Sequence, residues 1–384
     1  MVRYLWAAGL ARLADEMVVV AVVVLALARS DSSVLSGVVI AAYTVPSIVS
    51  GPLLGAWLDR ARRPVAALAA NQFALSAMAV AMVFVPAPWL VPVAFVAGIT
   101  LPLTSGGFTS LVPRLATDLP RATSQDALVF NAAAIGGPAL AGVLGAVASP
   151  AVAVAAVAVL SLAGGLCTTA LRVPPHPPAE HPSLGAAMKR GLRHLATTAP
   201  LRGATIASAV GYGSIGMLTT ALPLHLTALG VDRDRTGLVW AAIEVGCVVS
   251  VLAVRRHLPR WRPERVVFVA VALYGVTLAL WPLTSHFPVL LGLALVSGIA
   301  QGPTLTATMT ARQRYTPGPL LGQVSTTGAS LKLGAFALGA AGGGALLTAW
   351  SPAAVILSVA VGQLAGSSLG AATSRAKRAV DATP

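Results

Sequence analysis

The chain has 384 residues, of which 56% are hydrophobic and only 10% are charged, a composition unlike that of water-soluble domains. A helix needs about 20 apolar residues to cross a bilayer, so twelve crossings take about 240 residues and leave short loops. We therefore expect no attached soluble catalytic domain. The formal net charge of +14 rests on so few charged residues that we exclude a nucleic-acid groove.

The first half of the chain alternates apolar runs with charged or Pro/Gly breaks. These runs predict six helices, at 4–28, 34–57, 65–86, 89–111, 124–148 and 151–171. A polar stretch with four prolines follows at 173–178. The basic amphipathic segment at 183–198 is then predicted to lie on the membrane surface.

The second half repeats this pattern. It predicts six more helices, at 201–229, 236–254, 266–283, 289–311, 322–347 and 353–372. The expected fold is all-α, with twelve transmembrane helices in two pseudo-symmetric six-helix bundles. We place these bundles at 1–171 and 201–374, with a cytoplasmic linker at 172–200 between them and a cytoplasmic tail at 375–384.

The basic residues indicate the orientation of the chain. Most of the 26 Lys and Arg residues fall in the loops that lie on the same side as both termini, and such loops are retained in the cytoplasm. We therefore predict a multi-pass protein of the plasma membrane with both termini cytoplasmic. The two cysteines lie inside apolar runs, so we expect neither a disulfide framework nor a thiolate metal site.

A faint internal repeat relates the two halves. The residues Val-Ala-Gly-Ile at 96–99 correspond to Val-Ser-Gly-Ile at 296–299 in the second half. Such repeats are typical of transporters, in which two related bundles move around a site near the membrane midplane.

A charged motif lies between the second and third predicted helices. It consists of Gly55, Asp59, Arg60, Arg62 and Arg63. A lone acid among arginines can hold a loop against a neighbouring helix end in one conformation only, as a latch. The alternative is plain anchoring of the loop by its arginines in the cytoplasm, which leaves Gly55 and Asp59 unexplained.

This motif resembles the loop between helices 2 and 3 of the major facilitator superfamily. Gly55, Asp59, Arg60 and Arg63 match its pattern, whereas Arg62 and Pro64 depart from it. The resemblance covers essentially the whole chain through the six-plus-six layout. It implies a transporter fold, and a latch that favours the outward-open state.

A second resemblance lies in the fifth predicted helix. Gly137, Pro138 and Gly142 are similar to an element of drug and proton antiporters in this superfamily, which implies a flexible kink and efflux. Close packing of small residues is the alternative. The arginine that many proton-coupled members carry in helix 4 has no counterpart, because 89–111 holds no charge.

Three charges lie within the first predicted helix. Arg12, Asp15 and Glu16 share one narrow stripe, which must avoid lipid because each charge costs about 2.5 to 3.5 kcal/mol near the bilayer centre. We expect Arg12 to pair with one carboxylate and the other to carry the coupling proton. The alternative is a static ion-pair cluster that does not titrate. Asp126 is expected to begin the fifth helix, where the helix dipole favours a carboxylate.

A second polar pair, Glu244 and Lys332, falls near the middle of helices 8 and 11. These residues are predicted to form a gating contact or to supply a substrate counter-charge. The alternative is a lysine that helix carbonyls stabilise.

The predicted wall of a substrate cavity carries neutral polar groups. They are Tyr212, Ser214, Thr219, Gln301, Thr304, Thr306 and Thr308. Neutral groups favour an amphipathic or apolar ligand over a phosphate or a polyol. The hydroxyls can also bond to their own helix backbone, which is the competing interpretation.

We therefore expect a secondary active transporter that works by alternating access and exports a small amphipathic or apolar compound by proton coupling. An uptake symporter for a small metabolite is the alternative, and a non-transporting sensor or an enzyme with a Lys332 Schiff base is less favoured. No metal or other cofactor and no catalytic site are expected. The expected partners are a small-molecule substrate, protons and membrane lipid, with the chain as a monomer.

Overall fold

Helices make up the computed structural model, which describes residues 1–30, 32–173, 183–232 and 235–375. Within these ranges no strand is present, and the predicted all-α fold is confirmed. By length and composition, 11 helical segments in the described residues can cross a membrane. The 29-residue helix α1 is not among the 11, and it contains Arg12, Asp15 and Glu16. The linker residues 174–182 and the tail from 376 lie outside the described ranges.

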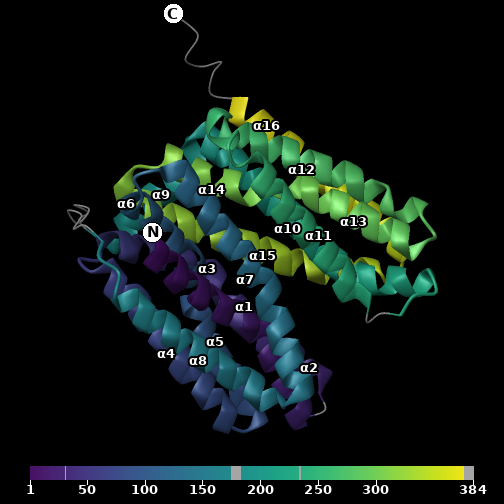
Figure 1. Cartoon of the computed structure of the whole chain (residues 1–384), viewed down its shortest axis with the longest axis horizontal. Helices are drawn as coiled ribbons and strands as arrows, with labels where there is room; N and C mark the ends of the chain where they lie inside the picture. Colours follow the sequence, from purple (N-terminus) through teal and green to yellow (C-terminus); the bar gives the residue numbers. More distant parts are fainter. Residues whose placement is uncertain (31, 174–182, 233–234, 376–384) are drawn as a thin grey trace, which may run out of the picture. The chain divides into compact units, whose positions relative to one another are not determined.

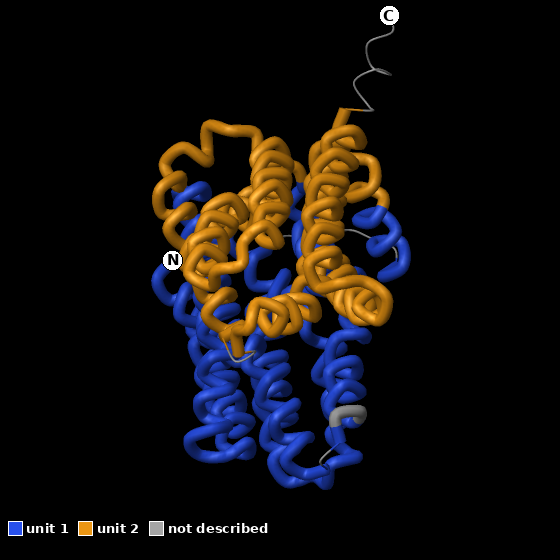
Figure 2. The backbone as a smooth tube through the Cα atoms, turned by 90° about the vertical axis from the view of Figure 1, so that its right-hand side faces the viewer, with its two compact units in different colours: residues 1–192, 316–330 blue, residues 193–315, 331–384 orange. Residues whose placement is uncertain are grey.

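The chain divides into two compact units (Figure 2). Unit 1 comprises residues 1–192 with 316–330, and unit 2 comprises 193–315 with 331–384. Residues 316–330 belong to unit 1 because the start of helix α15 hydrogen-bonds to Asp59 and Gly51 of helix α3. The predicted bundle boundaries at 171 and 201 stay a prediction.

Unit 1 is built around α1, which packs against α7 and α8 (Figure 1). Its helices are α1 (Val2–Ser30), α2 (Ser33–Thr44), α3 (Pro46–Arg60), α4 (Pro64–Phe84), α5 (Leu90–Pro102), α6 (Phe108–Leu115), α7 (Leu119–Val147) and α8 (Pro150–Thr169).

Unit 2 is built around α10, which packs against α16 and α12. Its helices are α10 (Ala199–Ala228), α11 (Thr236–Val254), α12 (Pro263–Ala279), α13 (Phe287–Gln301), α14 (Pro303–Tyr315), part of α15 (Leu321–Leu346) and α16 (Pro352–Arg375).

The basic amphipathic segment forms helix α9 (Leu184–Thr197). Ala187, Gly191 and Leu195 recur every four residues and are buried, whereas Lys189 and Arg190 are exposed. The helix that the sequence predicts here is confirmed, and its place on the membrane surface stays a prediction.

Three helices that we expected to be continuous are interrupted. The predicted helix at 34–57 breaks at Val45, because Pro46 cannot donate a backbone hydrogen bond. The predicted helix at 89–111 contains a π-helical turn over Leu103–Gly107, directly after Pro102. The predicted helix at 289–311 is divided at Gly302 into α13 and α14.

The same pairs of helices pack together in both halves. The packing of α1 on α8 and of α2 on α5 has its counterpart in α10 on α16 and α11 on α13. Gly98 lies against the backbone of Tyr43, and Gly298 lies against the backbone of Ile243, so that a Cβ at either position would collide with a carbonyl oxygen. The faint repeat in the sequence therefore marks one close helix contact that occurs twice.

Candidate functional site

Two charged side chains of α1 are buried inside unit 1. Arg12 is 2% exposed and Asp15 is 8% exposed, while Glu16 is half-buried. Alanines fill much of the same helix, and Ala11 lies against Gly164 of α8. Two of the three charges of the stripe thus lie in the interior of the unit, and its avoidance of lipid stays a prediction.

Arg12 binds Asp126 of α7. Its Nη1 donates to Asp126 Oδ1 at 2.7 Å and its Nη2 donates to Oδ2 at 3.2 Å, which is the bidentate geometry of a strong arginine–carboxylate pair. Tyr4 also donates to Oδ1, at 2.8 Å, and the Thr109 hydroxyl lies 3.1 Å from Oδ2. Phe130 places its ring centroid 4.9 Å from the guanidinium carbon. Asp126 is fully buried, and Arg12 is 2% exposed.

We predicted that Arg12 pairs with Asp15 or Glu16. This prediction is wrong, because the carboxylate that Arg12 binds is Asp126. Long side chains on a helix point toward its N-terminus, so Arg12 extends away from the residues three and four positions further on. Asp126 lies across the helix contact instead. The prediction that Asp126 begins its helix is also wrong, because α7 starts at Leu119 and Asp118 is the N-cap, with its side chain accepting from the Arg121 N–H.

Asp15 has a different environment from Asp126. The Tyr43 hydroxyl of α2 donates to Asp15 Oδ1 at 2.5 Å, and Tyr43 is itself buried. Glu16 is the carboxylate next to Asp15 in the chain, and its backbone packs against Gly137 of α7. The hydrogen-bond donor to Asp15 is thus a neutral hydroxyl, whereas Asp126 accepts from a cation.

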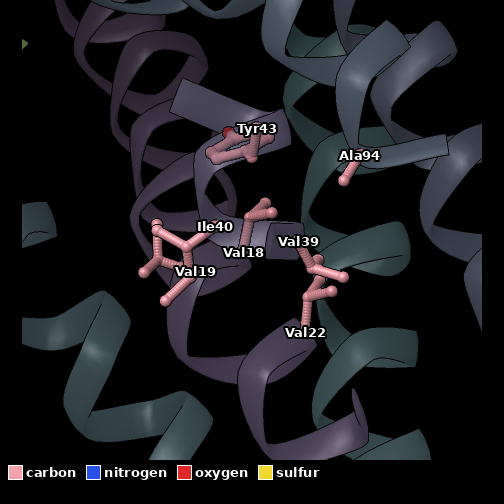
Figure 3. Close-up of a pocket in the computed structure, with 7 residues that line it drawn as sticks. All are labelled: Val18, Val19, Val22, Val39, Ile40, Tyr43 and Ala94. Carbon is pink, nitrogen blue, oxygen red and sulfur yellow. The ribbon is translucent and has the colours of Figure 1, made fainter. Parts of the chain in front are cut away.

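A small cavity adjoins the Asp15–Tyr43 pair (Figure 3). Its volume is about 10 Å³, room for about one water molecule. Apolar side chains from three helices line it, namely Val18, Val19, Val22, Val39, Ile40 and Ala94, together with Tyr43. One side of Tyr43 therefore borders this cavity, while its hydroxyl donates a hydrogen bond to Asp15.

Asp59 binds the start of helix α15. Its Oδ1 accepts from the Gly322 N–H at 2.7 Å and its Oδ2 accepts from the Gln323 N–H at 2.8 Å. The first N–H groups of a helix have no partner within the helix, so a carboxylate there is favourable. Gly55 packs against Gln323 and Thr326, where any side chain would collide. The acid and the glycine of the loop motif are therefore explained by one contact.

The arginines of this motif lie at the end of α3 and after it. Arg60 ends the helix and is half-buried, while Arg62 and Arg63 are exposed. The exposed arginines are consistent with anchoring of the loop in the cytoplasm, and the contact of Asp59 is consistent with a latch. Both roles stay predictions.

Helix α7 continues without a break through Pro138. Gly137 packs tightly on Glu16 and Met17 of α1, whereas a Cβ at Gly142 would meet open space. Close packing therefore accounts for Gly137 but gives no reason for Gly142, and the flexible kink stays a prediction.

In unit 2, Lys332 lies over an aromatic ring. Its Nζ is 4.1 Å from the ring centroid of Tyr212, and the Tyr212 and Phe336 ring centroids are 5.4 Å apart. Lys332 and Glu244 are both half-buried. The predicted pairing of Lys332 with Glu244 stays a prediction.

Several hydroxyls of the predicted cavity wall bond to their own helices. Ser214 donates to the Gly211 carbonyl at 2.8 Å, Thr219 to Gly216 at 2.6 Å and Thr308 to Thr304 at 2.7 Å. Ser214 also packs against Gly362 of α16, and Thr306 is buried. Gln301 ends α13, directly before the break at Gly302. Tyr212 is the member of this set that contacts a charged side chain.

Comparison with known proteins identifies the family. The sequence model of the family described as Major Facilitator Superfamily matches residues 5–340 of this chain. The chain belongs to the major facilitator superfamily. It is therefore a multi-pass membrane transporter.

One relative is similar in sequence, and two solved structures are similar in fold. A relative from Sinorhizobium fredii (strain NBRC 101917 / NGR234), described as the uncharacterized MFS-type transporter y4rN, is 29% identical over 361 residues, which are 90% of this chain and 87% of the relative. The human organic anion transporter MFSD10 (TETRAN) has a TM-score of 0.80 at 16% identity, covering 96% of this chain and 98% of that one. A bacterial homologue of the iron transporter ferroportin, in an outward-facing state, has a TM-score of 0.74 at 17% identity, covering 97% and 98%.

Several polar partners in this major facilitator fold could not be predicted from the sequence. Tyr4, Thr109 and Tyr43 each contact a buried carboxylate from another helix. Thr104, within the π-helical turn, accepts from the side chains of Asn71 and Gln72 at 3.0 Å each. Tyrosine and threonine are common in apolar helices, so only the helix contacts reveal which of them are partners.

Proposed function

We propose that this chain is a secondary active transporter that works by alternating access and exports a small amphipathic or apolar compound in exchange for protons. The observation that carries the proposal is the buried Asp15 with a neutral hydrogen-bond donor, Tyr43. Burying an ionised carboxylate is costly unless a cation compensates it. Asp15 can therefore hold a proton in one state and release it when water reaches it in another.

Asp126 is not the proton carrier in this proposal. Its charge is compensated by the bidentate Arg12, and Tyr4 and Thr109 contact its two oxygens. This pair holds α1, α6 and α7 together, and the proposal gives it a structural role.

The Asp59 contact supports alternating access. Both carboxylate oxygens accept from backbone N–H groups of α15, and such a contact depends on one placement of α3 and α15. We infer that this contact forms in one conformation of the transport cycle and acts there as a latch. Export as the direction rests on the α7 motif of Gly137, Pro138 and Gly142.

Flux in proteoliposomes tests the proposal. Vesicles that contain the purified chain would be given an imposed pH gradient, with rhodamine 6G and 2-naphthoate as amphipathic probes of opposite charge. In vesicles that contain the wild-type chain, we expect protons to move down their gradient while one probe moves in the opposite direction. Proton uptake with the probe in the same direction would establish the uptake symporter, and no flux under any gradient would establish a sensor.

Asp15→Asn is the decisive variant in this assay, with Glu16→Gln as the matched control. The proposal predicts that Asp15→Asn abolishes gradient-driven flux and retains exchange of labelled for unlabelled probe. Glu16→Gln is predicted to retain both. Gradient-driven flux that survives Asp15→Asn at the wild-type rate would contradict the proposal.

A further inference from the structure

Gln323, at the start of α15, contacts two other helices of unit 1. Its backbone N–H donates to Asp59 Oδ2 of α3 at 2.8 Å, and its side-chain Nε2 donates to the Met188 carbonyl oxygen of α9 at 2.6 Å. Gln323 is 1% exposed, and the residues of α9 up to Leu192 belong to the same unit as the start of α15. One buried residue therefore joins the backbone of α9 to the carboxylate of the proposed latch.

A glycine in α9 makes room for the side chain of Gln323. Gly191 is buried and lies three residues after Met188, so the two residues share one face of the helix. A Cβ at Gly191 would collide with the side-chain amide of Gln323. Glycine weakens the interior of a helix relative to alanine, so this close approach gives a physical reason for the glycine.

The contact between Gln323 and α9 is also suited to opening. Among the described residues, the buried Gln323 Oε1 has no hydrogen-bond partner, which is unfavourable until water can reach it. Helix α9 has 14 residues, and isolated helices of this length are marginally stable in water, so α9 depends on such contacts for its order. Loss of the contact should therefore loosen α9.

We propose that Gln323 couples α9 to the Asp59 latch, so that α9 docks when the latch forms and is released when the latch opens. Movement of the start of α15 away from Asp59 also carries the Gln323 amide away from the Met188 carbonyl. Coupling of this kind is reciprocal, so docked α9 stabilises the latch in return. Gln323 is then a positioning residue, and the helix of the predicted linker takes part in the conformational balance of the transporter.

This inference rests on the proposed function, because it extends the latch of that function to a further helix. Hydrogen-exchange mass spectrometry of the purified full-length chain in detergent tests it without a gradient or a probe. It can therefore fail while proton coupling through Asp15 stands, and the reverse also holds. Exchange at the Gly322 amide reports on the latch, because that amide donates to Asp59. Exchange in peptides that cover 184–192 reports on the docking of α9.

Two variants test the coupling from its two ends. Asp59→Ala, on α3, should make exchange in α9 about fivefold faster, the change in an equilibrium that one hydrogen bond makes. Gln323→Met removes the side-chain donor and retains the backbone N–H and a similar side-chain length, and it should make exchange at Gly322 faster by about the same factor. Asp118→Ala, at the exposed N-cap of α7, is the matched control and should leave exchange in α9 and at Gly322 unchanged.

Two results would overturn the proposal. One is exchange in α9 that Asp59→Ala leaves unchanged, as expected if α9 is held by other contacts alone, and the other is exchange at Gly322 that Gln323→Met leaves unchanged. Thermal unfolding of each variant shows whether it is folded. If either variant does not fold, Gly191→Ala decides the question, because its methyl group displaces the Gln323 amide and the proposal then requires faster exchange at Gly322. Unchanged exchange there would equally overturn it.

Discussion

Asp126 and Asp15 are two carboxylates buried in the same unit, and their partners differ in kind. Asp126 is held by a bidentate arginine and a tyrosine from α1 and by a threonine from α6. Asp15 is held by a neutral tyrosine beside a small apolar cavity. Removing the cation from a compensated buried carboxylate is costly, whereas the proposed function assigns proton exchange to the carboxylate that accepts from a neutral hydroxyl. In the proposed mechanism, Asp126 therefore belongs to a structural pair and Asp15 is the proton carrier.

Removing Arg12 should have the largest effect on stability. Arg12→Ala leaves the charge of Asp126 buried without its cation, which costs about 3 to 5 kcal/mol. We expect a large fall in the thermal unfolding temperature of the purified protein. Arg190→Ala, on the exposed face of α9, is the control and should change little. A loss below about 1 kcal/mol would mean that the pair does not hold the unit together.

Replacing both members of the pair sharpens this test. Arg12→Met combined with Asp126→Leu removes both charges and retains similar volume, and such replacements of buried ion pairs are often neutral or stabilising. We expect the double variant to recover most of the stability that Arg12→Ala loses. Transport driven by a pH gradient should survive in it, because Asp15 is unchanged.

Arg29 is a half-buried arginine whose hydrogen bonds go to backbone carbonyls. At the end of α1 its guanidinium donates to the carbonyls of Met82 at 2.9 Å and Val85 at 2.6 Å, and also to that of Val83. These groups end α4, so Arg29 caps that helix. Because hydrogen bonds to charged groups contribute about 1.5 to 3 kcal/mol, we expect Arg29→Ala to cost about 2 kcal/mol, less than Arg12→Ala. Thermal unfolding of the two variants side by side gives the ranking, and the reverse order would contradict the account.

The two tyrosines form a matched pair of smaller tests. Tyr4→Phe removes one of several donors to Asp126 and should cost about 1 kcal/mol without changing the pH dependence of transport. Tyr43→Phe removes the donor to Asp15, so the pH dependence of transport should change. Flux against pH in both variants is the measurement. An equal change in the pH dependence of flux in both variants, or a change in Tyr4→Phe alone, would contradict the distinction between the two carboxylates.

The smallest effect is expected at Asp59. Asp59→Asn replaces the charge that binds the N-terminus of α15 and keeps one acceptor oxygen, which should cost about 1 kcal/mol or about fivefold in the balance between conformations. Accessibility of single cysteines to a membrane-impermeant reagent measures that balance. Asp118→Asn, at the exposed N-cap of α7, is the control and should leave the labelling ratio unchanged.

The sequence predicts the architecture well because long apolar runs and basic loops are local signals. It also finds the charged stripe of α1 and the loop acid Asp59. It fails on partners, since Arg12 and Asp126 are 114 positions apart and only the packing of α1 on α7 joins them. The interruption at Leu103–Gly107 was equally invisible, because one extra residue in a helical turn leaves the apolar pattern nearly unchanged.

Infrared difference spectroscopy tests the central claim most directly, because a protonated carboxyl group has its own C=O stretching band. Spectra of the purified protein at acidic minus alkaline pH should contain a band from a buried carboxylic acid. The account predicts that Asp15→Asn removes this band and that the Arg12→Met, Asp126→Leu double variant retains it. A band that persists in Asp15→Asn and disappears in the double variant would show that Asp126 carries the proton, and would contradict the account.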